Sequence, residues 1–148
     1  MQSRRVAALG TIGEDGTPYV SMVPYAMVPR AGCLVIHVSG LAAHTGNLQA
    51  RPDVSLLVVE AEVLGESVHA LPRVTLAGVA VILKPSSSDW VECKSAYLTK
   101  FPEAEPMTQL GDFMFAAIRI SGARHVVGFG TARSIDDAEL GMALGPPS

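Results

Sequence analysis

Short runs of apolar residues, many of them β-branched, recur along most of this chain and are separated by turn residues. Runs of this length and composition indicate β-strands. The first run ends at Gly13-Glu14-Asp15-Gly16, where the Asp-Gly pair is typical of a tight hairpin turn. The pattern predicts strands over residues 6–12, 18–28, 33–38, 54–59, 73–83, 113–120 and 125–133. The last two are expected to form a hairpin around residues 121–124.

Two segments have helical spacing instead. Residues 41–50 place Leu41, Thr45 and Leu48 on one face, and Pro52 follows as a stop signal. A second helix is predicted after the serines at 86–88, with Asp89 as its capping residue. The apolar stripe of this helix should pack on the sheet, and it consists of Trp90, Cys93, Tyr97 and Phe101.

Seven strands in mostly antiparallel order, with short helices, favour a closed β-barrel over an open sheet. Gly78 interrupts an apolar strand and is expected to mark a bulge or a corner of the barrel. Residues 63–72 show no periodicity and are interpreted as a loop. A length of 148 residues suits one domain, so a single domain over residues 1–148 is expected.

The composition argues against several function classes. The net charge is −3 and Lys and Arg are not clustered, which argues against nucleic acid as a partner. No apolar run approaches the ~20 residues of a membrane-spanning helix, so no membrane association is expected. Cys33 and Cys93 stand alone and the histidines form no metal-binding motif, so no metal site is predicted. A reducing cytoplasm is the simplest location for such a chain.

The segment 39–48 carries the most informative candidate chemistry. A helix that follows a buried strand directly presents free backbone N–H groups and the positive end of its dipole. Ser39, His44, Thr45 and Asn47 add side-chain donors nearby, a combination that suits a phosphate monoester. The ordinary alternative is a serine that only caps the helix. Arg73 at a strand end also has two interpretations: its side chain could bind a phosphate, or it could simply face solvent.

Three further features each have a functional and a structural interpretation. Pro24 after Ser21-Met22-Val23 bends a strand, so that backbone atoms could face a flat heterocycle, or it marks an ordinary sheet edge. His125 could face solvent or act as an axial haem ligand. Gly128-Phe129-Gly130 lies in a strand and cannot be a dinucleotide-binding turn. Its glycines would instead let a ring or another chain pack closely.

Taken in order, these segments resemble the pyridoxamine phosphate oxidase-related FMN-binding split barrels, and within them the haem-utilisation (HugZ-like) branch. The residues that carry the resemblance are 9–12, 15–21, 39–48, 54–57, 73–78 and 128–132. The resemblance implies a mainly β fold, an FMN-binding split β-barrel with two or three short helices. It also implies a homodimer with two FMN molecules held in clefts between the subunits.

The resemblance assigns roles to individual positions. It places Ser21, Met22 and Val23 along the isoalloxazine ring, Ser39, His44, Thr45 and Asn47 around the phosphate and ribityl chain, Arg73 beside the flavin, and Phe129 against it from the partner subunit. Family members often hold the phosphate with Arg or Lys, whereas this chain offers His44 and neutral donors. Weak retention of FMN is therefore expected.

The function expected from this resemblance is that of an FMN-dependent oxidoreductase acting on a small substrate. Only Ser21 or Tyr25 offers acid–base chemistry beside the expected ring, so the catalytic residues stay unassigned. Two alternatives remain. One is a non-catalytic flavin- or haem-binding module, and the other is a haem-degrading oxygenase of the haem-utilisation type.

Overall fold

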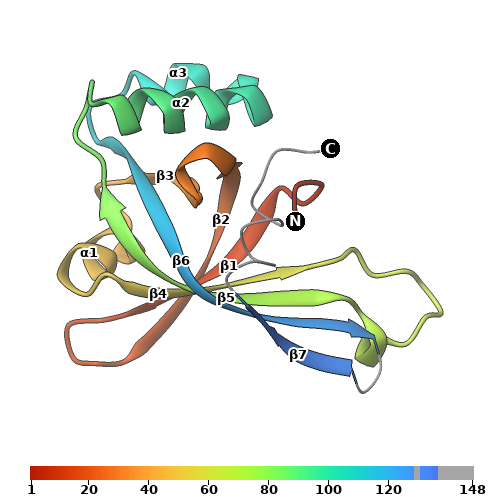
Figure 1. The fold of residues 1–148 in the computed structure, drawn as a ribbon. Helices are drawn as coiled ribbons and strands as arrows, with labels where there is room; N and C mark the ends of the chain where they lie inside the picture. Colours follow the sequence, from red (N-terminus) through yellow and green to blue (C-terminus); the bar gives the residue numbers. More distant parts are fainter. Residues whose placement is uncertain (129–130, 137–148) are drawn as a thin grey trace.

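A computed structural model describes residues 1–128 and 131–136 of the chain. Within these residues one antiparallel sheet is formed by β1 (Val6–Ile12), β2 (Pro18–Val28), β3 (Cys33–Ser39), β4 (Asp53–Val59), β5 (Arg73–Ile82), β6 (Phe113–Gly128) and β7 (Thr131–Ile135). The strand order is β3-β2-β1-β4-β5-β6-β7, and β3 also pairs with β6. That extra pairing closes the first six strands into a barrel (Figure 1). The mainly β, split-barrel prediction is confirmed.

One predicted turn is wrong. The hairpin expected around residues 121–124 does not exist, because β6 continues through them as a single strand paired with β5. Ala77 lies opposite Gly122 and Gly78 lies opposite Ile120, so Ser121 is the extra residue of a β-bulge. The Ser-Gly pair is thus a bulge signal here, and the bulge expected at Gly78 is confirmed. Beyond the barrel, the second half of β6 pairs with β7.

Short helices lie around the barrel. They are α1 (Ala43–Ala50), α2 (Ser88–Lys100), α3 (Glu105–Thr108) and the 3₁₀-helices η1 (Pro29–Ala31), η2 (Val68–Ala70) and η3 (Pro102–Ala104). Figure 1 shows α2 and α3 together beyond the barrel, at the end where β3 meets the start of β6. The loop between β4 and β5 projects from the opposite end. None of the described helices is long and apolar enough to cross a membrane.

The helix starts differ from their predictions. The capping residue of α2 is Ser87, whose Oγ accepts a hydrogen bond from the Trp90 backbone N at 3.2 Å. The prediction of Asp89 was wrong because the helix begins earlier, which places Asp89 in its first turn, where a negative charge favours the helix dipole. Similarly, α1 begins at Ala43, and Leu41 before it is 88% exposed.

Two apolar clusters hold the fold together. The first fills the barrel interior and includes Leu9, Tyr25 and Leu56. The second lies between the outside of β3 and β6 and the buried face of α2, where Cys93, Tyr97 and Phe101 pack as the stripe predicted. Strand β3 contributes to both clusters, which explains why nearly every residue in it is apolar.

Candidate functional site

The inward-facing side of β2 meets the start of α1 at a serine–histidine contact. The side chains of Ser21 and His44 are both half-buried, and Ser21 Oγ lies 2.9 Å from His44 Nδ1. Burial lowers the pKa of His44, because it disfavours the charged imidazolium. Val23, two residues further along the same face of β2, is 2% exposed and points into the barrel core, whereas Met22 is 65% exposed on the opposite face. The structure therefore brings the side chains of Ser21 and His44 together and places the Met22 side chain on the other side of the strand.

The expected phosphate donors at α1 already have intramolecular partners. Ser39 Oγ accepts from the Leu41 backbone N at 3.2 Å, and the buried Thr45 Oγ1 donates to the Ser39 carbonyl at 2.5 Å. Asn47 Nδ2 donates to Thr11 Oγ1 at 3.1 Å. These bonds fasten α1 to β3 and β1. Ser39 accepts in its bond, so its O–H can still donate, as can the first backbone N–H groups of α1, whose N-cap residue makes no side-chain cap.

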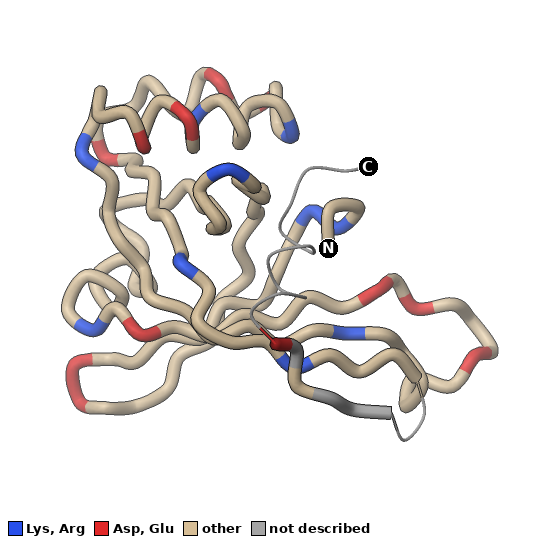
Figure 2. The backbone as a smooth tube through the Cα atoms, in the orientation of Figure 1, with Lys and Arg blue, Asp and Glu red and all other residues tan. Residues whose placement is uncertain are grey.

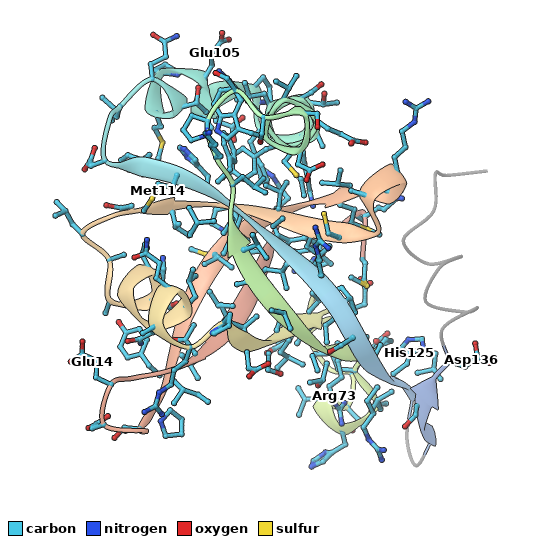
Figure 3. All side chains as sticks on the ribbon, turned by 60° about the vertical axis from the view of Figure 1, so that its left-hand side comes forward. Glu14, Arg73, Glu105, Met114, His125 and Asp136 are labelled. Carbon is cyan, nitrogen blue, oxygen red and sulfur yellow. The ribbon has the colours of Figure 1, made fainter. Side chains whose placement is uncertain are left out.

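Arg73 and His125 belong to a different region, at the open end of the barrel. They line a cavity of about 500 Å³. Its other lining residues are Met1, Gln2, Ser3, Val58, Glu60, Pro72 and Val74. Figure 3 shows Arg73 and His125 at the same end of the molecule, away from Glu14 and Glu105.

The floor of this cavity is apolar and its polar groups lie at the edge. Val58 and Val74 both belong to the barrel core, so the cavity opens onto the barrel interior. His125 pairs with Val74 across β5 and β6, which places it on the same face of the sheet. Arg73 also lines the cavity, and its Nη1 donates to the Leu71 carbonyl at 2.9 Å. The Arg73–His125 cavity thus combines an imidazole, a cation and an apolar floor.

Acidic residues adjoin this cavity. The loop after β4 carries Glu60, Glu62 and Glu66, and Glu60 lines the cavity itself. Figure 2 shows acidic residues along this loop and basic residues scattered over the rest of the described chain. Glu60 is therefore the carboxylate that lines the cavity together with Arg73 and His125.

Within one chain the predicted site residues form two groups instead of one. Strands β1 and β4 lie between Ser21 on β2 and Arg73 on β5. Phe129 lies outside the described residues. Sequence reasoning missed Glu60 and the N-terminal residues 1–3, which no motif or periodicity marks. Among the described residues no group of three or more His, Cys, Asp or Glu is placed to hold a metal ion.

Comparison with known proteins identifies the family of this chain. Residues 1–127 match the family model described as pyridoxamine 5'-phosphate oxidase. The chain belongs to the pyridoxamine 5'-phosphate oxidase family. The resemblance deduced from the sequence is therefore confirmed.

Three proteins similar to this chain are named as haem oxygenases or as a haem-binding protein. The chain is 29% identical over 140 residues to the heme oxygenase HutZ of Vibrio cholerae, covering 94% of this chain and 78% of HutZ. It is 39% identical over 118 residues to HOZ, a chloroplastic heme oxygenase of Arabidopsis thaliana, covering 80% of this chain and 34% of HOZ. A solved heme-binding protein from Mycobacterium smegmatis superposes with a TM-score of 0.83 at 30% identity. That match covers 95% of this chain and 56% of the other, so the chain spans only part of two of these three relatives.

Proposed function

We propose that this protein binds haem in the Arg73–His125 cavity and takes part in haem breakdown. The observation that carries the proposal is the cavity, which joins an imidazole to an apolar floor at one end of the barrel. Its volume of about 500 Å³ is within the range of small-molecule sites. The names of HutZ, HOZ and the Mycobacterium smegmatis protein support haem over flavin as the ligand.

The residues of the cavity fit the chemistry of haem. Histidine is the commonest protein ligand of haem iron, and His125 is the only histidine among the residues that line this cavity. The haem propionates are carboxylates, which the planar guanidinium of Arg73 can meet with paired N–H donors. Val58, Val74 and Pro72 would contact the apolar macrocycle. When bound, haem supplies the iron at which oxygen is activated.

The protein's own contribution is therefore to hold and orient the ligand. With haem bound, His125 would hold the iron and Arg73 would hold the propionates, while the apolar residues of the cavity would exclude water from the ring. Glu60 is the carboxylate in the cavity, and it can accept or return a proton at its side-chain oxygen.

Haem titration of the purified protein tests this assignment. Wild type is expected to give a shifted Soret band that saturates at one haem per chain. His125→Ala should lose that shift and bind at least about tenfold more weakly, since an axial ligand is removed. His69→Ala removes an exposed histidine on η2 and should behave as wild type. Loss of the shift in His44→Ala, with His125→Ala unaffected, would place the haem elsewhere.

Adding an electron donor to the haem complex distinguishes breakdown from simple binding. Breakdown predicts that ascorbate or a reductase system bleaches the Soret band and releases a tetrapyrrole product and iron. If the haem complex survives many equivalents of reductant in air, the protein binds haem but does not break it down.

FMN remains the second candidate ligand, at Ser21, Met22 and His44. The observation in its favour is a groove of about 630 Å³ on the outer face of β2, which Val20, Ser21 and Met22 line, together with the contact of Ser21 with His44 at the start of α1. We propose that FMN there would lie across the outer face of β2, with Phe129 contributed by a second subunit. Quenching of FMN fluorescence in an equilibrium titration would support this; an FMN signal that micromolar protein leaves unchanged would count against it.

We also propose that a second copy of the chain covers this outer face. Val20 and Met22 are 68% and 65% exposed, and Val6 and Leu57 beside them are exposed as well. Large apolar surfaces of this kind usually face a partner. Light scattering should give the mass of a homodimer, and a monomer at working concentration would contradict it. Free Cys33 and Cys93 agree with a reducing cytoplasm as the place where it works.

A further inference from the structure

The chain's two cysteines, far apart in sequence, meet beneath α2. Cys33 is the first residue of β3 and Cys93 lies on the buried face of α2. Both are free thiols, and both belong to the apolar cluster between α2 and the barrel. Within that cluster each thiol is the group that most strongly influences the pKa of the other, so the two side chains are neighbours. Neither belongs to the proposed haem or flavin site.

We propose that Cys33 and Cys93 form a redox-active pair that a hydroperoxide converts to a disulfide, thereby tying α2 to β3. Cys33 is the attacking thiolate and Cys93 is the resolving thiol. The contact with Cys93, together with the nearby charge of Arg119, lowers the pKa of the Cys33 thiol. The same contact and burial raise the pKa of the Cys93 thiol. Arg119 lies directly opposite Cys33 on β6, so the nearby cation favours the thiolate at Cys33.

The chemistry balances in two steps. With hydrogen peroxide, the Cys33 thiolate attacks one oxygen, which breaks the O–O bond and, with one proton, gives a sulfenic acid and water; an organic hydroperoxide releases its alcohol in place of this water. Cys93 then loses its proton, its sulfur attacks the Cys33 sulfur, and the S–O bond breaks. The products are the disulfide and a second water. Two electrons pass from the dithiol to the peroxide overall.

Access to this pair is controlled by α2. Both side chains are buried, so a peroxide reaches them when α2 moves away from the barrel. The cluster beneath α2 is separate from the cluster that fills the barrel. The helix can therefore open while the barrel core stays packed, as local unfolding units commonly do. The disulfide would prevent that opening.

The test is a peroxide titration of the native protein followed by mass spectrometry. The expected product has lost two hydrogens per chain and links the tryptic peptide that ends at Lys94 to the one that begins at Ala31. Its unfolding temperature should rise by several degrees and fall back on addition of dithiothreitol. In Cys93→Ser, Cys33 should stop at the sulfenic acid and react with dimedone. In Cys33→Ser, Cys93 should be oxidised about tenfold more slowly.

Met107 provides an internal measure of the dose, because it is exposed and peroxide converts it to the sulfoxide. If both cysteines can still be alkylated after denaturation once Met107 is fully oxidised, the proposal is wrong. A disulfide found only between chains, or one that appears only when circular dichroism shows loss of the fold, would overturn it equally.

Discussion

Replacement of Gly78 by alanine should destabilise the barrel at its bulge. An added Cβ at this position would lie 2.7 Å from the Arg119 carbonyl oxygen and 2.8 Å from Ile118 Cγ2. Both distances are well inside ordinary van der Waals contact, and the first partner is backbone of β6 that cannot swing aside. The paired strands must therefore separate locally, which lengthens the hydrogen bonds between β5 and β6.

The expected cost follows from what overpacking costs elsewhere. Forcing an extra methyl group into a packed site costs about 1–3 kcal/mol. Against this, alanine loses less backbone entropy than glycine on folding, which returns about 0.4–1 kcal/mol. A net loss of ~1–2 kcal/mol remains, and for a chain of this length each kcal/mol lowers the unfolding temperature by about 2–4 °C.

Urea unfolding followed by circular dichroism measures this change in the free energy of unfolding. Gly46→Ala is the matched control, because an added Cβ there meets nothing within 4 Å and the position lies inside α1. Alanine in a helix interior should stabilise by about 0.5–1 kcal/mol. The two variants should therefore shift the midpoint in opposite directions. If Gly78→Ala is as stable as wild type, the close packing described at the bulge is incorrect.

Three further predictions concern buried and capping residues. Burial and the charge of Lys94 lower the pKa of His37 in the folded protein. Below pH 6.5 the unfolded chain therefore binds a proton at this histidine that the folded chain does not bind. The free energy of unfolding should fall as the pH drops from 6.5 through the folded pKa. His37→Phe should flatten that decline, by at most ~1.4 kcal/mol per pH unit, in urea unfolding between pH 7 and 5; an unchanged slope would be contrary. Ser87→Ala should cost about 1 kcal/mol by removing the α2 cap, with Ser88→Ala as its near-neutral control in thermal unfolding. Phe115→Ala should cost ~3–5 kcal/mol, since the ring is buried against His37; a loss below 1 kcal/mol would contradict that packing.

Much of the barrel was predictable from local pattern alone. Apolar residues on both faces of β3 indicate a strand buried between two layers, and the alternation in β1 and β4 indicates strands with one solvent face. The same reasoning failed at Ser121-Gly122, because a bulge and a turn have the same local composition. Only the partner strand decides between them: the register with Gly78 leaves Ser121 unpaired and lets β6 continue.

The candidate site was less accessible to sequence reasoning. Ser21 and His44 were both singled out, yet their contact depends on how α1 folds back on β2. Arg73 and His125 were each considered separately, and their shared cavity arises from the pairing of β5 with β6. No motif around Glu60 predicts that it lines the cavity, because its place there depends on where β4 ends and the following loop begins.

Resonance Raman spectroscopy of the ferrous haem complex tests the central claim most directly, since it detects the bond between iron and an axial histidine. The account predicts an iron–histidine stretching band in wild type and in His69→Ala, its loss in His125→Ala, and its return in that variant when free imidazole is added. A band that persists unchanged in His125→Ala would contradict haem ligation in the Arg73–His125 cavity.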